Sequence, residues 1–340
     1  QWLEANPPNG TVNVDKLKSF LNVRLGQTWE ETGESPRVNE LMRNTRQYLP
    51  GTIPDLTCES DDNGKIVMLS LSADLNGIME RSNEDVRVDW EVLAHSSTGC
   101  VYSVDHGSIG TFKRERDKSK LERETDGERD KWTYTHGVKN SVWPELEKLI
   151  KKEWICESGE IRKITISVVD TGHFTHNAYT FIKSINDAFV YGVKGVTDKN
   201  YRAIKKDTPL VKASREQSKL YLLEVDALKT ELAEQMKLRL GNDDYQPPGF
   251  MNFPQSNEGK YTYQSYFMHY EGEAKVEEKE GDQVIGYMWK KKNNQSQNHF
   301  WDVRVYNNAC KYIWIDLYKK TDSKKKHIQS WADFIEDLGL

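Results

Sequence analysis

Two stretches of this sequence that read as buried strands each end at or near an aspartate, and this pairing limits the folds that the chain can adopt. Residues 163–170 read KITISVVD and residues 65–77 read KIVMLSLSADLNG, so Asp170 and Asp74 follow the two runs. A carboxylate at the tip of a buried strand costs free energy unless it has a partner. Asp170 alone could cap the next helix, since Asp is a favoured N-cap residue. A second aspartate in a comparable position favours a shared metal ion or an acid-base role.

The order of the other elements indicates a mixed sheet. Three expected strands lie within residues 65–107 and are joined by short turns, which predicts an antiparallel meander. A helix, the strand that ends at Asp170, another helix, a strand over 188–195 and further helices follow. Helices on the faces of a mixed sheet define an α/β fold, and this order matches the ribonuclease-H-like layout.

In a sheet of this order the strands that carry Asp74 and Asp170 lie side by side, so their carboxylates are expected to meet at one edge. Adjacent carboxylates repel each other unless a cation lies between them, and Mg²⁺ prefers oxygen ligands. Asp302, in the segment NHFWDVRVY, lies in the opening turns of the last strong helix. It is either a favourable charge at a helix N-terminus or a third ligand. The three aspartates together predict a two-ion site that cleaves phosphodiesters.

Composition narrows the possible partners and compartments. The 340 residues are 30% charged and carry a net charge of −5, so any anionic partner must meet a local basic patch. The four cysteines are scattered, which fits a reducing compartment and argues against a Cys-based zinc site. The sequence has no signal peptide and no apolar run of the roughly 20 residues that a membrane span needs. It also lacks a G-x-x-x-x-G-K-[ST] loop, so no ATP site is expected in this chain.

The aspartate motifs also make the sequence similar to a known family, the nuclease part of the large terminase subunit of tailed bacteriophages, in the lambda-type branch. SADLNG resembles its first aspartate motif, VVDTGHFTHNAYTFI its second, YGVKG its strand-lysine-glycine element, and GYMWKKKNNQSQNHFWDVRVYNNA its closing region. The shared order extends over residues 17–315. The resemblance implies that Asp74, Asp170 and Asp302 bind two Mg²⁺ or Mn²⁺ ions. It also implies cleavage of double-stranded, concatemeric viral DNA during packaging.

The resemblance further implies a domain organisation and a set of partners. Residues 1–57 are expected to be a linker that follows a missing ATPase motor domain, since the chain opens without Met at Gln1. Residues 58–340 are expected to form the nuclease domain, with a charged insertion at about 112–132 and a basic C-terminal tail. The implied partners are double-stranded DNA, the small terminase subunit, the portal of the procapsid and the motor domain in cis. The implied location is the cytoplasm of the infected bacterial host.

Two features depart from the family pattern. His299 stands where the family usually has an acidic residue, close to the aspartate of the last helix. The charged insertion at about 112–132 is larger than usual. It is read as a solvated loop, and an added contact with DNA or a partner protein is the alternative.

Several basic residues are candidates for DNA contact. Lys194 follows a strand and could bind phosphate, although an ordinary solvated lysine is the alternative. His173 and His176 could orient a water or a phosphate, or could form hydrogen bonds with the backbone. Residues 281–326 hold ten Lys or Arg against four Asp, and Lys290, Lys291 and Lys292 cluster there. Such a cluster is either a solvated face or a contact with the DNA backbone.

Two other functions compete with a terminase nuclease. One is a related resolvase or recombinase with the same fold, which would need dimer or strand-exchange elements that the sequence does not indicate. The other is a catalytically inactive module that docks on DNA or on the portal. A metal titration separates the docking module from a nuclease, because docking needs no divalent ion.

Overall fold

The computed structural model describes nine segments of the chain. They comprise residues 38–55, 64–77, 86–110, 132–185, 189–196, 210–214, 219–280, 283–293 and 296–340. Most of the expected linker at 1–57 and nearly all of the expected insertion at 112–132 lie outside these segments.

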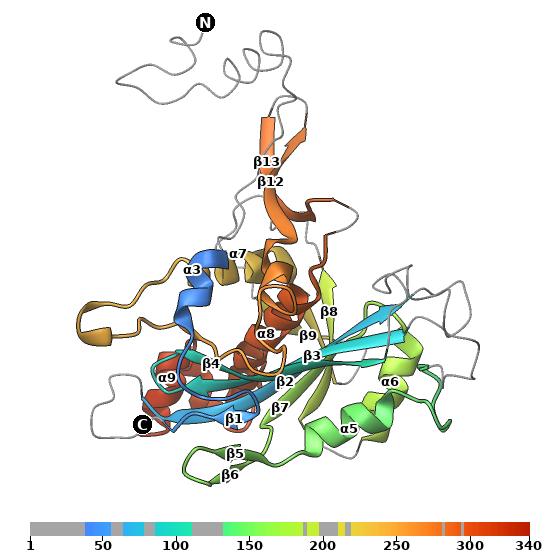
Figure 1. Cartoon of the computed structure of the whole chain (residues 1–340), viewed down its shortest axis with the longest axis horizontal. Helices are drawn as coiled ribbons and strands as arrows, with labels where there is room; N and C mark the ends of the chain where they lie inside the picture. The colour runs from blue at the N-terminus through green and yellow to red at the C-terminus, as the bar shows by residue number, and fades with distance from the viewer. Residues whose placement is uncertain are drawn as a thin grey trace, which may run out of the picture.

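An eight-stranded sheet lies at the centre of the molecule (Figure 1). Its strand order is β11-β4-β3-β2-β7-β8-β10-β9. In chain order the strands are β2 (Ile66–Gly77), β3 (Val86–Ser96), β4 (Val101–Gly110), β7 (Ile166–Asp170), β8 (Val190–Val196), β9 (Val211–Ala213), β10 (Leu220–Glu224) and β11 (Met251–Asn252). The predicted meander of β2, β3 and β4 is confirmed, and β7 pairs in parallel with both β2 and β8. The sheet is therefore mixed, consistent with a ribonuclease-H-like fold.

Helices cover both faces of this sheet (Figure 1). The α-helices are α3 (Val38–Leu41), α5 (Trp143–Lys151), α6 (Thr175–Ser184), α7 (Val225–Met236), α8 (His299–Lys319) and α9 (Trp331–Asp337). The 3-10 helices are η1 (Met42–Asn44), η3 (Asn242–Asp244), η4 (Phe267–Glu271) and η5 (Ser323–His327). Within the described part of the chain, no helix combines the length and the apolar content that a bilayer crossing requires.

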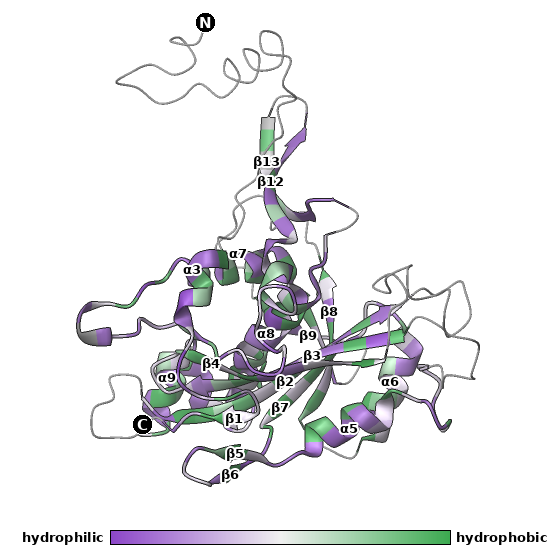
Figure 2. Ribbon diagram, viewed as in Figure 1, coloured by the Kyte–Doolittle hydropathy of each residue, from purple (hydrophilic) through white to green (hydrophobic). Residues whose placement is uncertain are grey.

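The hydrophobic core has two parts, one on each side of the sheet. Helices α5 and α6 bury Trp143, Leu146 and Phe181 on one side. The spacing of the buried residues in α5 is helical, and Figure 2 shows hydrophobic and hydrophilic residues mixed along that ribbon, as in an amphipathic helix. Successive side chains of β7 point to opposite faces of the sheet, so Val168 belongs to one hydrophobic cluster and Val169 to the other.

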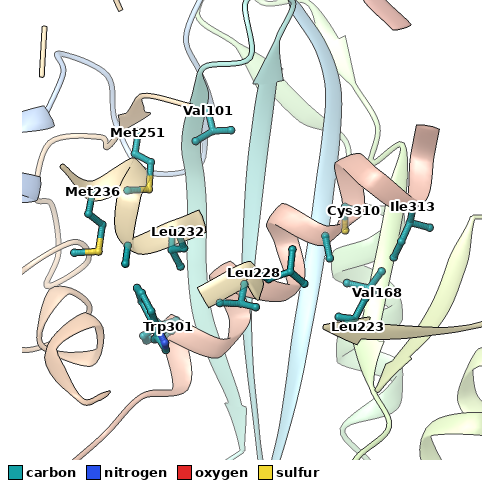
Figure 3. Packing of buried hydrophobic residues seen from close by; sticks show 14 of the residues in the cluster. Val101, Val168, Leu223, Leu228, Leu232, Met236, Met251, Trp301, Cys310 and Ile313 are labelled. Carbon is teal, nitrogen blue, oxygen red and sulfur yellow. The ribbon is translucent and has the colours of Figure 1, made fainter. Parts of the chain in front are cut away.

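Helices α7 and α8 form the core on the other side. Leu228 and Leu232 of α7 pack in one cluster with Trp301 and Ile313 of α8 and with Val168 of β7 (Figure 3). This packing lays the long helix α8 across the sheet. It therefore decides where the first turn of α8 lies relative to the strand ends.

Two smaller sheets complete the described structure. One consists of β1 (Thr52–Ile53), β5 (Trp154–Cys156) and β6 (Ile161–Arg162). The other is a hairpin of β12 (Glu273–Glu280) and β13 (Gln283–Lys291), which extends away from the body of the molecule (Figure 1). The sequence interpretation did not include this hairpin.

Candidate active site

Asp74 and Asp170 lie next to each other at one end of the central sheet. Strands β2 and β7 pair in parallel, with Ala73 opposite Val169, so each aspartate is one step beyond a paired position. Both aspartates are buried. The prediction that the two strands are neighbours is therefore confirmed, because parallel strands bring their carboxyl ends to the same edge.

The same face of β2 carries a row of polar side chains that meets α8. Ser70 Oγ donates a hydrogen bond to Asn307 Oδ1 over 2.6 Å, and Ser72 Oγ donates one to the carbonyl oxygen of Val303 over 2.7 Å. Alternate residues of a strand share one face, so Asp74 follows these two serines towards the start of α8. Asp302 lies in the first turn of that helix. The helix thus brings the third aspartate to the same sheet end.

The charges of the three aspartates influence one another. Burial and the neighbouring Asp74, with a further effect of Asp302, raise the pKa of Asp170 to about 7. The backbone N–H of Gly172 opposes this shift by donating to Asp170 Oδ1 over 3.0 Å. Burial raises the pKa of Asp302 to about 6, although the Lys229 ammonium opposes this shift. Burial and neighbouring carboxylates therefore disfavour the charged forms of Asp170 and Asp302.

Glu273 adds a fourth carboxylate, which the sequence interpretation missed. Lys229 of α7 contacts both oxygens of Glu273 at 2.8 Å and Asp302 Oδ1 at 2.8 Å. Asn298 Nδ2 donates to Glu273 Oε1 over 2.6 Å and to Asp302 Oδ2 over 2.7 Å. Tyr306, one turn beyond Asp302, has a pKa well above its ordinary value because of burial and the charges of the nearby aspartates. Its hydroxyl therefore stays protonated at neutral pH.

Asp89 and His299 border the site on the β3 side. Asp89 lies opposite Asp74 in the β2–β3 register, and Arg87 Nε lies 2.7 Å from its Oδ1. Asn76 Nδ2 donates to Asp74 over 2.9 Å and to Asp89 over 3.1 Å. His299 Nδ1 lies 3.9 Å from Asp74 Oδ2. Burial lowers the pKa of His299, but Asp74 and Asp89 outweigh burial and raise it above the ordinary value.

Lys194 and the two candidate histidines lie near the ends of strands β8 and β7. Lys194 is exposed on β8, one residue beyond Val193, which pairs with Asp170. His173 and His176 are exposed between the end of β7 and the first turn of α6.

The lysine cluster belongs to the hairpin. Lys290, Lys291 and Lys292 are exposed at the end of β13, and Lys291 pairs with Glu273 across the base of the hairpin. Lys194 and the two histidines therefore follow strand positions at or beside Asp170, and Lys291 of the lysine cluster lies opposite Glu273.

The donor set suits a hard divalent cation. Asp74, Asp170, Asp302 and Glu273 offer only oxygen atoms, which Mg²⁺ and Mn²⁺ prefer, and burial together with the charge of Asp74 raises the pKa of Asp170. Among the residues that the structure describes, no group of three or more Asp, Glu, His or Cys side chains has the geometry to hold a metal ion without rearrangement. Magnesium commonly keeps water or substrate phosphate in its remaining positions, so one or two carboxylates per ion suffice.

Sequence comparison relates this chain to a known protein family. A sequence model of the family described as terminase large subunit gpA, endonuclease domain, matches residues 1–318. A search of curated protein sequences finds no match. The family supports a nuclease role in phage DNA packaging, with DNA and the packaging machinery as partners. This chain belongs to the family of terminase large subunit gpA endonuclease domains.

Proposed function

We propose that this chain hydrolyses phosphodiester bonds of double-stranded, concatemeric DNA by a two-metal-ion mechanism. The proposed ligands of Mg²⁺ or Mn²⁺ are Asp74, Asp170 and Asp302, and Glu273 is an additional candidate. The parallel pairing of β2 with β7 carries the proposal, because it supports two buried carboxylates side by side at one sheet end. The pKa of Asp170, raised to about 7 by burial and by Asp74, supports a cation between them.

Bound ions would polarise the scissile phosphate, activate water and stabilise the leaving oxygen. The chain's own residues would bind and orient the substrate. Lys194 and the lysines at 290–292 would neutralise backbone phosphates on two sides of the carboxylates. His173 and His176 would lie against the DNA beyond the end of β7. Asn298 would hold the carboxylate of Asp302 in its observed orientation, through the hydrogen bond of 2.7 Å.

This activity would serve genome packaging. The proposed partners are the small terminase subunit, the portal of the procapsid and an ATPase motor domain in the same polypeptide. Packaging would take place in the cytoplasm of the infected bacterial host. Since assembly partners would direct the cut, the isolated chain should nick DNA weakly and with little sequence preference.

Nicking of supercoiled plasmid with Mn²⁺ or Mg²⁺ tests the proposal. The native chain should nick the plasmid only when the metal is present, and Asp170→Asn should abolish nicking. Asp316→Asn is a matched control, because Asp316 lies on the same helix as Asp302 but 14 residues away, roughly 21 Å along the axis. An inert native chain, or an Asp170→Asn variant that cuts as well as the parent, would favour a docking module without chemistry.

A further inference from the structure

The four carboxylates of the candidate site form two pairs, and a lysine ammonium contacts only one of them among the described residues. Glu273 and Asp302 share one internal cation, because Lys229 Nζ lies 2.8 Å from oxygen atoms of both. Asn298 donates hydrogen bonds to both carboxylates as well. Lys229 and Glu273 are buried, so water screens this contact little.

The second pair, Asp74 and Asp170, has no comparable cation among the described residues. Asp74 accepts a hydrogen bond from the Asn76 amide, and Asp170 accepts one from the backbone N–H of Gly172. Of the described basic residues, His299 has its Nδ1 3.9 Å from Asp74 and 4.0 Å from Asp89. The two hydrogen bonds to this pair come from uncharged donors, so they offset its charge less than the Lys229 ammonium offsets that of Asp302 and Glu273.

We infer that Lys229 is a tethered cation that competes with a metal ion for Asp302 and Glu273, so that the two ion positions of the site differ in affinity. This inference rests on the proposed function. The Asp74–Asp170 pair takes the first ion, because no ammonium group of the described residues must leave it. An ion at Asp302 and Glu273 binds more weakly, because it must displace the ammonium of Lys229 or share the carboxylates with it.

A purely structural ion pair would behave differently. Removing one partner of a buried ion pair destabilises a protein whatever the role of the pair, so loss of stability alone does not distinguish the two cases. Metal affinity does distinguish them. If Lys229 is purely structural, its replacement leaves the metal affinity unchanged. If Lys229 competes with the metal ion, its replacement raises the metal affinity.

Titration of the metal-free full chain with Mn²⁺, without DNA, tests the inference. Electron paramagnetic resonance reports the free Mn²⁺, and so the number of bound ions and their affinities. The native chain should bind one ion with higher affinity and a second at least 10-fold more weakly. Lys229→Gln should strengthen the second binding event at least 10-fold, and Lys229→Arg, which keeps the charge, should retain the native pattern. Lys237→Gln is the matched control, because Lys237 directly follows α7 and is paired with Glu234 at an exposed position.

The outcomes separate this inference from the proposed function. Two ions of equal affinity in the native chain would overturn the role of Lys229 without any variant, which matters if Lys229→Gln fails to fold. An unchanged second event in a folded Lys229→Gln variant would overturn it as well. Mn²⁺ binding that is absent, or that Asp170→Asn leaves intact, would instead contradict the proposed metal site itself.

Discussion

Arg304 of α8 forms an ion pair with Glu91 of β3, and solvent reaches neither side chain. Arg304 Nη2 lies 2.8 Å from Glu91 Oε1, and the hydroxyl of Tyr266 donates to the same oxygen over 2.5 Å. Arg304 Nε also donates to the hydroxyl of Tyr270 over 3.1 Å. Arg304 lies two residues after Asp302, so this buried network fixes the start of α8 over the strand that neighbours β2.

Arg304→Met is expected to lower the free energy of unfolding by about 3–5 kcal/mol, because it leaves Glu91 buried without its cation. Urea unfolding followed by circular dichroism measures the change. Lys320→Met removes an exposed pair with Asp316 and should cost less than about 1 kcal/mol. Equal losses in the two variants would show that the buried pair has no special part in holding α8.

Asp170→Asn is expected to stabilise the metal-free protein at pH 8 and to have little effect at pH 4. Burial and Asp74 raise the pKa of Asp170 to about 7, so the folded state binds a proton more tightly than the unfolded chain does. The stability that this group contributes is full below an unfolded pKa of about 4 and is lost as the pH rises through 7. The variant should therefore gain on the order of 2–4 kcal/mol over the parent at pH 8.

Unfolding by urea at several pH values checks this difference, and Mn²⁺ provides a second comparison. Added Mn²⁺ should stabilise the parent more than the variant at pH 8, because the ion would offset the repulsion between the ionised carboxylates of Asp74 and Asp170. A difference between parent and variant that stays constant from pH 4 to pH 8 would contradict the raised pKa of Asp170.

Strands β2, β3, β4, β7 and β8 and the strand-end positions of the first two aspartates could be predicted because burial imposes a pattern on the sequence, whereas β9, β10 and β11 were not expected. Strand β7 is apolar and β-branched and β2 is largely apolar where they lie between helices, and the short turns between β2, β3 and β4 indicate the meander. The order of elements then makes the strands of Asp74 and Asp170 neighbours. The hairpin of β12 and β13 leaves no such pattern, because its outer part is largely exposed and Glu273–Glu280 is rich in charged residues.

Glu273 and Lys229 could not be predicted as site residues for a related reason. Glu273 begins a run of mixed charges that is typical of a solvated segment, and Lys229 lies in a helix with many charged residues. Their burial results from tertiary contacts between α7, α8 and the base of the hairpin, which lie far apart in sequence. Only the structure reveals that contact.

Replacement of Lys290, Lys291 and Lys292 by Gln is expected to weaken the salt dependence of DNA binding. Each phosphate contact adds about 0.9 to the slope of log affinity against log salt concentration, so loss of three contacts should reduce the slope by about 2–3. Fluorescence anisotropy with a labelled duplex, without divalent metal, measures the slope. Replacement of the lysines at 324–326 makes the same charge change in η5 and should leave the slope unchanged. Equal reductions in both variants would indicate only a general effect of net charge.

Trp331→Ala is expected to destabilise the fold by about 3–5 kcal/mol while the nicking activity of the folded protein is kept. Trp331 begins α9, beyond the residues that match the family, and its Nε1 donates to the carbonyl oxygen of Ser96 over 2.9 Å. Ser96 pairs with Ile66 at the start of β2, eight residues from Asp74 and roughly 26 Å along the strand. Thermal unfolding and plasmid nicking at 20 °C measure the two effects, with Leu338→Ala as an exposed control. Loss of nicking by a Trp331→Ala variant that is still folded would mean that α9 acts on the site and not only on the core.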